Sequence, residues 1–183
     1  MARAIPAGGD FDGWVRLLAH AGSRQRARRH LMQAGSPGAL PALRQGLRHA
    51  DPFVRRVCAS ILDHLVDEAS LPDLVAALDD EDPDVVKRAL HALACDACKE
   101  NECRPTDDLF VPRAVEMLDH PDPRIRAGAI DALGKAVQRS ADPASPAACA
   151  LAAVHEREPV SGLRHMARRR LDSAERRRRS SSP

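Results

Sequence analysis

The sequence predicts an all-α protein, a right-handed α-solenoid of about five helix-turn-helix repeats. One stretch, residues 112–133, has the apolar spacing of two short amphipathic helices on either side of a Pro-rich turn. The same template recurs upstream in register, and a helix pair this short needs similar neighbours to bury its apolar stripe. With one Trp, three Phe and no Tyr, the chain is also a poor candidate for β architecture.

Six columns of residues recur in three copies of this template, which chance would not keep in register. Each first helix begins at a proline, whose missing N–H costs nothing there, and each second helix follows an Asp-Pro pair in which Asp caps the helix. An apolar residue, a small residue and a leucine come next. The columns are Pro41, Pro72 and Pro112; Leu47, Leu78 and Leu118; Asp51-Pro52, Asp82-Pro83 and Asp122-Pro123; Val54, Val85 and Ile125; Cys58, Ala89 and Ala129; and Leu62, Leu93 and Leu133.

Weaker copies of the template flank these three. Trp14 lies in a segment like a first helix, where it is predicted to pack the open end of the stack, and Ala27 and Leu31 occupy the small-residue and leucine columns. Ala167 and Leu171 occupy the same columns near the C-terminus. Both copies lack the Asp-Pro turn, as expected for the terminal repeats that cap a solenoid.

The segment DPRIRAGAIDALG, from Asp122 to Gly134, resembles the second helix of a short HEAT repeat of the kind named after phycobilisome lyases. The resemblance extends over about residues 10–175, and it implies that the second helices line a concave surface for a partner. We therefore expect a flexible lead-in, five repeats, a Cys-rich insertion and a disordered basic tail. These segments are 1–9 for the lead-in; 10–35, 38–66, 70–98, 108–138 and 146–175 for the repeats; 95–107 for the insertion; and 176–183 for the tail.

The net charge of +2 conceals a polarity along the chain. Residues 1–49 carry a net charge of +6, residues 50–139 carry −8, and residues 140–183 carry +4. Such a rod does not offer a continuous track to a phosphate backbone. We therefore expect nucleic acid to bind only weakly, through the basic termini.

Hydropathy and cysteine use indicate the compartment. The sequence has no apolar run near the ~20 residues of a membrane helix, and its first residues lack the apolar core of a signal peptide. We expect a cytoplasmic monomer without a membrane partner, in which the five cysteines are reduced.

The junction after the third repeat is nine residues longer than the preceding one and contains three cysteines. Cys95 and Cys98 have the C-x2-C spacing that chelates a soft ion, and Cys103 follows in the loop. His91 lies one turn before Cys95, so that at about 100° per residue positions 91, 95 and 98 would share a helix face away from the core. We therefore predict a structural Zn²⁺ held by Cys95, Cys98, Cys103 and His91.

Two alternatives stay open for this cluster. Its cysteines could be redox-responsive free thiols in a surface loop, or they could hold an iron–sulfur cluster whose fourth thiolate comes from far away in the sequence. The other two cysteines, Cys58 and Cys149, are predicted to be buried and inert.

The sequence contains no recognisable catalytic constellation and no glycine-rich phosphate loop. We therefore predict a non-enzymatic scaffold for a protein partner. The alternatives are a metal- or redox-responsive regulator and, from the resemblance, an enzyme of the bilin-lyase or DNA-glycosylase kind. A dense basic patch at Arg24, Arg26, Arg28, Arg29 and His30 is predicted to be a solvated face, with contact to an acidic partner as the alternative. The predicted partner surface consists of Arg55, Arg56, Lys87, His91, Arg126, Asp131 and Lys135.

Overall fold

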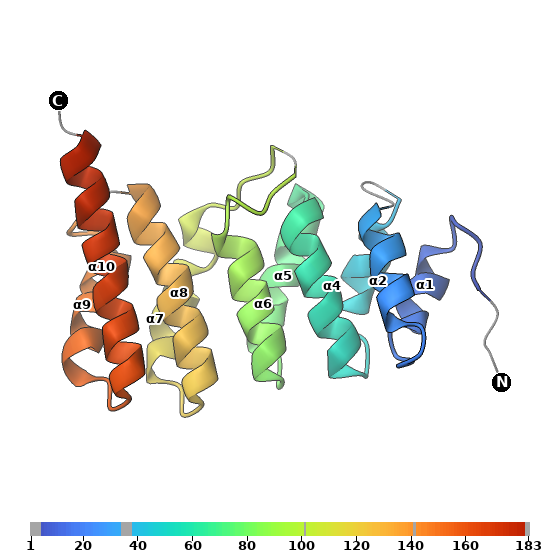
Figure 1. The fold of residues 1–183 in the computed structure, drawn as a ribbon, viewed down its shortest axis with the longest axis horizontal. Coiled ribbons are helices and arrows are strands. Elements are labelled where there is room, and N and C mark those ends of the chain that lie inside the picture. The colour runs from blue at the N-terminus through green and yellow to red at the C-terminus, as the bar shows by residue number, and fades with distance from the viewer. Residues whose placement is uncertain (1–4, 34–37, 101, 141, 182–183) are drawn as a thin grey trace.

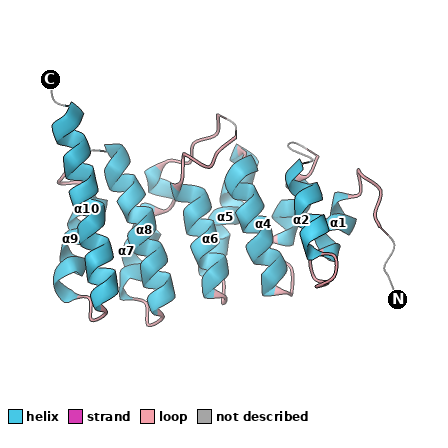
Figure 2. Cartoon of the chain, in the orientation of Figure 1, coloured by secondary structure: helices cyan, strands magenta, loops and turns pink. Residues whose placement is uncertain are grey.

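The computed structural model describes residues 5–33, 38–100, 102–140 and 142–181, and these ranges contain helices, turns and loops but no strand (Figure 2). Within them, ten α-helices form five helix-turn-helix pairs that stack in chain order from the N-terminus to the C-terminus (Figure 1). The predicted all-α solenoid of about five repeats is confirmed.

The second helices of the pairs lie side by side in one layer, and α1, α5, α7 and α9 lie behind them (Figure 1). The first helices are α1 (Phe11–Leu17), α3 (Leu40–Gly46), α5 (Leu71–Ala76), α7 (Val111–Glu116) and α9 (Pro146–Arg157). The second helices are α2 (Arg24–Gln33), α4 (Pro52–Leu65), α6 (Pro83–Ala94), α8 (Pro123–Ser140) and α10 (Ser161–Ser181). Short 3-10 helices are η1 (Glu68–Ser70), η2 (Ala77–Asp79), η3 (Asp107–Leu109) and η4 (Met117–Asp119).

Proline and aspartate begin the helices as the sequence predicts. A proline lies in the first turn of α3, α5 and α7. At the start of α4, α6 and α8, the carboxylates of Asp51, Asp82 and Asp122 accept a hydrogen bond from the backbone N–H two residues further on, at 2.9, 2.8 and 2.8 Å. Each bond satisfies an N–H group that has no partner inside its helix.

The predicted apolar and small columns form the core of the stack. All of their residues are at most 6% exposed. The core is continuous because α4 packs on α6, α6 on α8, and α8 on α10. In the terminal repeats Ala27, Leu31 and Ala167 are fully buried, whereas Leu171 is only partly buried.

Trp14 closes the N-terminal end of this core, as predicted, and is 4% exposed. Its ring stacks on His30 with the centroids 4.1 Å apart, and its Nε1 donates a hydrogen bond to the Ala7 carbonyl at 3.0 Å. Nε2 of His30 in turn donates to the Gly8 carbonyl at 2.9 Å. The lead-in predicted for residues 1–9 is therefore held against the first repeat at its end, and its first four residues lie outside the described ranges.

The prediction of a disordered tail from residue 176 is wrong for the described residues, because α10 continues through Ser181. The helix is anchored as far as Ala174, which is 3% exposed in the core. Glu175 then pairs with Arg179 one turn later at 2.5 Å, which offsets part of the repulsion between the arginines. The last two residues of the predicted tail lie outside the described ranges.

Candidate functional site

Two residues of the predicted partner surface, Arg55 and Arg126, are buried instead, with 7% and 9% exposure. Arg55 donates hydrogen bonds to Asp80 of the next repeat at 2.7 and 2.9 Å. Arg126 does the same with Glu158, at 2.8 Å for both bonds. The prediction that these two guanidinium groups face a partner is wrong, because both are taken up by ion pairs between successive repeats.

The same arginines also close the turns of their own repeats. Nη1 of Arg55 donates to the carbonyls of His49 and Ala50 at 2.9 and 3.1 Å. Nη1 of Arg126 makes the equivalent bonds in its own turn at 2.9 and 3.0 Å. Each side chain thus satisfies two turn carbonyls and one carboxylate, so that its role is to join helices and repeats.

A pair of repeated columns, missed in the sequence, explains these contacts. Three residues before the small-residue position, four of the five repeats have an arginine: Arg24, Arg55, Arg126 and Arg164. The third repeat has Val86 at this position. In the turn before each second helix from α4 onward, one side chain accepts the backbone N–H two residues further on, at 2.8 to 3.0 Å: His49, Asp80, His120 and Glu158. Where this turn residue is an acid, as at Asp80 and Glu158, it pairs with the arginine of the preceding repeat. Val86 cannot form such a pair, and the turn of the next repeat has His120 in place of an acid.

The other cationic and acidic residues of the predicted surface lie on the side of the stack formed by the second helices. Arg56 is half-buried and pairs with a carboxylate of α6 at 3.1 Å. Lys87 is exposed and has no ion pair within the described ranges. Asp131 is half-buried and pairs with both Lys135 and Arg170. This surface therefore keeps a mixed charge, although it has lost two of its predicted members.

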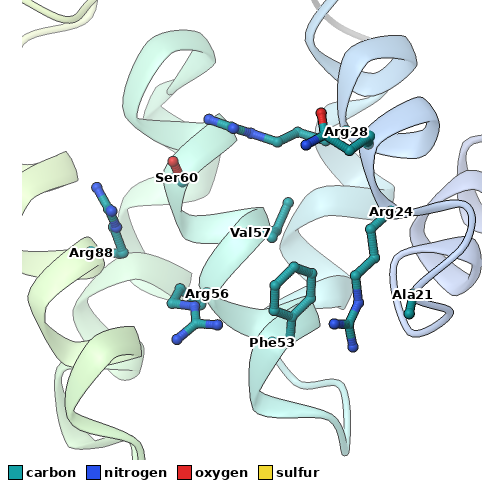
Figure 3. Close-up of a pocket in the computed structure, with 9 residues that line it drawn as sticks. Ala21, Arg24, Arg28, Phe53, Arg56, Val57, Ser60 and Arg88 are labelled. Carbon is teal, nitrogen blue, oxygen red and sulfur yellow. The ribbon is translucent and has the colours of Figure 1, made fainter.

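A pocket of about 430 Å³ opens between α2, α4 and α6 on this side of the stack (Figure 3). We call it the arginine pocket, because four of its lining residues are Arg24, Arg28, Arg56 and Arg88. Its other lining residues are Ala21, Gln25, Phe53, Val57 and Ser60. Arg24 and Arg28 belong to the basic patch that the sequence predicts to be solvated, whereas Arg56 and Arg88 come from other repeats.

Phe53 organises the floor of the arginine pocket. The guanidinium carbon of Arg24 lies 3.9 Å from the Phe53 ring centroid, and that of Arg56 lies 5.2 Å from it. In Figure 3 the two guanidinium groups lie on either side of the ring. Both distances are within the range of cation–π attraction. The ring therefore holds two positive charges close together.

The two remaining arginines of the pocket carry charge for which the described residues supply no partner. Arg28 and Arg88 are exposed, and within the described residues neither makes an ion pair or a side-chain hydrogen bond. Arg28 comes from α2 and Arg88 from α6, which are the helices on either side of α4, and the Arg28 side chain extends across α4 (Figure 3). The pocket therefore presents paired guanidinium groups at its floor and unpaired ones at its edges.

A second hollow, of about 260 Å³, lies between α6, α8 and α10. Its lining includes Lys87, Arg88, His91, Asp131 and Met166. Since Arg88 lines both this hollow and the arginine pocket, the two adjoin along the second-helix side. His91 thereby connects this surface to the cysteine-rich loop.

The cysteines of that loop do not continue a helix face as predicted. Helix α6 ends at Ala94, and Cys95 has an extended backbone and is 7% exposed, so it is buried. The turn after the helix nevertheless brings Cys95 Sγ to 3.2 Å from Cys98 Sγ, and His91 Nε2 to 3.5 Å from Cys98 Sγ. Three of the four predicted ligands therefore converge, with ligand atoms within 4.8 Å of one another.

The fourth predicted ligand, Cys103, does not belong to this group in the described structure. It is half-buried against the hydrophobic core, farther along the loop. A carboxylate is closer to the group, because Oδ2 of Asp63 lies 3.4 Å from His91 Nε2. Asp63 comes from α4, in the preceding repeat, and no local spacing in the sequence connects it to the cysteines.

Buried Lys99 anchors the loop to both neighbouring repeats. Its ammonium group, in a side chain with 0% exposure, donates to the Asp63 carboxylate and carbonyl at 3.1 and 3.0 Å and to the Ala92 carbonyl at 2.5 Å. Arg139 of α8 donates to the Ala94 carbonyl at 2.6 Å. The loop is therefore held to the neighbouring repeats by these hydrogen bonds.

The thiols differ in how accessible and how acidic they are. Burial, the hydrogen bond with Cys95 and the charge of Asp63 together raise the pKa of Cys98 to about 12, so Cys98 is a neutral thiol at neutral pH. Burial likewise raises the pKa of Cys58 to about 12, which fits its prediction as an inert core residue. Cys149 in α9 is exposed, so the prediction that it is buried is wrong.

Comparisons with known proteins support the fold. Residues 13–94 match the HEAT repeats family. An engineered protein from the Northeast Structural Genomics Consortium is similar over 92% of this chain and 80% of its own, with a TM-score of 0.57 and 21% identity. A second engineered protein from the same consortium is similar over 90% of this chain and 80% of its own, with a TM-score of 0.58 and 23% identity.

A designed armadillo repeat protein, solved in complex with the peptide (KR)4, covers 91% of this chain and 82% of its own, with a TM-score of 0.60 and 19% identity. No curated protein matches the sequence. None of the helices in the described ranges has both the length and the hydropathy needed to cross a bilayer. At these identities the structures share a fold and no more, but the family match covers the first three repeats, whose columns continue through the fourth. Residues 13–94, which contain the first three repeats, are therefore similar to the HEAT repeats family, and the described chain has the fold of a helical-repeat solenoid.

Proposed function

We propose that the protein is a non-catalytic scaffold that binds an acidic segment of a partner protein on its second-helix side. The arginine pocket carries this proposal. It offers four guanidinium groups around one cavity, and two of them have no counter-charge within the described residues. A carboxylate that enters would form charge-assisted hydrogen bonds at a site that Phe53 has already positioned.

The shape of the surface favours an extended segment over a single small anion. The arginine pocket adjoins the second hollow through Arg88, so that contacts can continue from α2 to α10. Lys87 and Met166 in the second hollow add a further cation and an apolar contact. A chain that alternates acidic and apolar residues would match this order of groups.

The same surface is a poor match for duplex nucleic acid. Carboxylates interrupt its cations, with Asp84 beside the arginine pocket and Asp131 in the second hollow. A phosphate backbone requires positive charge at a regular spacing over several contacts. The single aromatic ring of the pocket, Phe53, already lies between two guanidinium groups.

A structural relative supports peptide binding by a stack of this kind, because a designed armadillo repeat protein has been solved with the basic peptide (KR)4. The arginine pocket has the charge that would repel such a peptide. We therefore expect the opposite preference in this chain, for carboxylates over cations.

The test measures the binding of a fluorescein-labelled (ED)4 peptide by fluorescence anisotropy, with (KR)4 and a short DNA duplex as competing ligands. Replacing Arg28 or Arg88 with Glu should weaken (ED)4 binding at least about tenfold, because a hydrogen bond to a charged group contributes about 1.5–3 kcal/mol. Arg16→Glu is the matched control, since Arg16 is 67% exposed on α1, in the other helix layer. The control should change the affinity by less than about twofold.

Equal losses in the three variants would show that only net charge matters and would contradict the proposal. Tighter binding of the duplex than of (ED)4, with the same dependence on Arg28 and Arg88, would assign the pocket to nucleic acid instead. Circular dichroism of each variant checks that the helices remain folded.

A metal-responsive regulator is a second candidate function, and one observation favours it. His91 lines the hollow beside the arginine pocket while its Nε2 faces the thiol of Cys98. An ion on that nitrogen would fix the imidazole and so shape the hollow. If (ED)4 binds equally well with and without zinc, this second function is refuted and the scaffold proposal is unaffected.

A further inference from the structure

We infer that Cys95, Cys98, His91 and Asp63 form a tetrahedral Zn²⁺ site that links the second and third repeats. This set replaces Cys103 with a carboxylate from α4. The inference rests on the geometry and charge of the loop and is independent of peptide binding.

The distances between the ligand atoms resemble the edges of a zinc tetrahedron. Metal–ligand bonds of ~2.3 Å to sulfur and ~2.0–2.1 Å to nitrogen and oxygen imply edges of roughly 3.7 Å between two sulfurs, 3.5 Å from sulfur to nitrogen and 3.3 Å from nitrogen to oxygen. The corresponding distances are 3.2 Å from Cys95 to Cys98, 3.5 Å from Cys98 to His91 and 3.4 Å from His91 to Asp63. These are three of the six edges. Asp63 lies outside the group whose ligand atoms are all within 4.8 Å of one another, so its carboxylate would have to move toward the cysteines to close the tetrahedron around an ion.

The imidazole of His91 is oriented as in many metal sites. Its Nε2 faces Cys98 and Asp63, and its Nδ1 faces the other way, 3.8 Å from Asp131 Oδ2 and 3.5 Å from Lys135 Nζ. A carboxylate behind the second nitrogen fixes the ring orientation of a metal-binding histidine. Asp131 is therefore placed as the supporting group of the site.

The charges near the site balance only when Lys99 is included. Zn²⁺ with two thiolates and one carboxylate has a net charge of −1, which is costly in a buried position. The buried ammonium group of Lys99 lies 3.1 Å from Asp63 Oδ1, while Oδ2 of the same carboxylate lies on the His91 side. Its positive charge would bring the whole site to neutrality.

The ligand types select zinc among the common ions. Two sulfurs exclude Mg²⁺ and Ca²⁺, which prefer oxygen ligands. Two cysteines are too few for the four thiolates of an ordinary iron–sulfur cluster, and the third cysteine of the loop lies outside the group. A set of two sulfurs, one nitrogen and one oxygen, with four ligands in all, suits tetrahedral Zn²⁺.

The ligands come from three segments that meet at one repeat junction. Asp63 lies near the end of α4, His91 lies near the end of α6, and the cysteines lie in the turn after it. Lys99 and the Glu100 N–H, which donates to the His64 carbonyl at 3.0 Å, already hold the same segments together. A bound ion would therefore reinforce an existing contact between the second and third repeats.

The test uses the full chain, reduced and stripped of metal with a chelator, and titrates it with Zn²⁺ against a chromophoric competitor. We expect about one equivalent of Zn²⁺ per chain. Cys98→Ser should weaken Zn²⁺ binding by more than about 100-fold, and Asp63→Asn by at least the roughly 10–100-fold that loss of a supporting group costs. Cys103→Ser and Cys149→Ser are matched controls that should leave the affinity within about twofold of the parent chain, because neither cysteine belongs to the group.

Titration with Co²⁺ provides a readout that does not depend on stability. Sulfur-to-cobalt charge-transfer absorption should appear in the parent chain and in Cys103→Ser, and it should be lost in the double variant Cys95→Ser, Cys98→Ser. If Cys103→Ser removes the signal as completely as Cys98→Ser, the proposed ligand set is wrong. If the fully reduced parent chain takes up no metal, or loses none of its affinity with Asp63→Asn, the inference is likewise overturned.

Discussion

Replacing Arg126 with Val tests how the repeats are joined. The third repeat provides the template, because it has Val86 in the same column and His120 in the turn that follows. We therefore consider Arg126→Val alone and together with Glu158→His. The double variant copies into the last junction a pair of residues that the chain already uses elsewhere.

The single variant should be costly. Glu158 is 5% exposed, and Arg126→Val would remove both of its 2.8 Å hydrogen bonds while leaving its carboxylate in place. Removing one partner of a buried ion pair destabilises a protein by about 3–5 kcal/mol, since the other charge stays buried. The carbonyls of His120 and Pro121 would also lose their donor.

The double variant should recover most of this loss. Histidine at position 158 carries no obligatory charge, and it can still accept the Val160 N–H, as His120 accepts the Asp122 N–H at 3.0 Å. Only the turn carbonyls then lack a partner, at a cost of about 1–2 kcal/mol. We expect the double variant to be about 2–3 kcal/mol more stable than the single one.

Denaturant unfolding followed by circular dichroism measures these differences. Arg157→Val is a matched control, because Arg157 also pairs with the preceding repeat, at 3.1 Å to Asp119, but is 57% exposed. This control should cost at most about 1 kcal/mol. If Arg126→Val costs no more than the control, or if the double variant is no more stable than the single one, the account of the junction is wrong.

Three further predictions concern single positions. Gly46→Ala should cost about 1–3 kcal/mol in unfolding free energy, because its Cβ would lie 2.4 Å from Cys58 Sγ, and adding Cys58→Ala should recover part of the loss. The hydrogen bonds from Arg126 and the Val160 N–H hold the pKa of Glu158 below its usual range. The parent chain should therefore be more stable than Glu158→Gln, with the full difference in unfolding free energy above about pH 5. In unfolding measurements at a series of pH values, this difference should shrink as pH falls through the lowered pKa. His49→Asp should draw Arg24 toward the turn and weaken (ED)4 binding in the anisotropy assay without lowering stability.

The sequence predicted the core well because burial in a repeat is a local property. Each second helix buries the same offsets against its neighbours, so that Val54, Cys58 and Leu62 in one copy identify their equivalents in the others. The Asp-Pro turns were predictable for the same reason, since Asp51 caps its own helix through the N–H of Phe53. Neither inference requires knowledge of which repeats touch.

The fate of the arginines could not be predicted from one repeat alone. Arg55 and Arg56 are adjacent in sequence, and a helical wheel places both near the surface. Arg55 is buried because the next turn supplies Asp80, whereas Arg56 stays half-exposed beside α6. A signal was present in the sequence, however, since the turns after Arg55 and Arg126 both contain an acid, Asp80 and Glu158, at the same position.

The cluster of His91, Cys95 and Cys98 shows a similar division. C-x2-C spacing correctly predicted that Cys95 and Cys98 would meet, because a turn of that length brings both sulfurs to the same side. It could not show that α6 ends before Cys95, which buries that thiol, or that Cys103 packs elsewhere. Asp63 lies in a different repeat, so only the fold places it beside His91.

The arginine pocket lies where one arginine of the repeated column, Arg24, has no acid in the turn of the next repeat with which to pair. Arg55 and Arg126 each meet an acid in the next turn and are buried, but the turn after Arg24 carries His49 instead. Arg24 keeps a bond to its own turn, at 3.1 Å to the Leu18 carbonyl, while its nearest carboxylate, Asp51, is 4.0 Å away. Its guanidinium group therefore lies over the Phe53 ring and lines the pocket. The same residue at the same offset joins two repeats where the next repeat supplies a carboxylate, and it lines the proposed binding pocket where the next repeat does not.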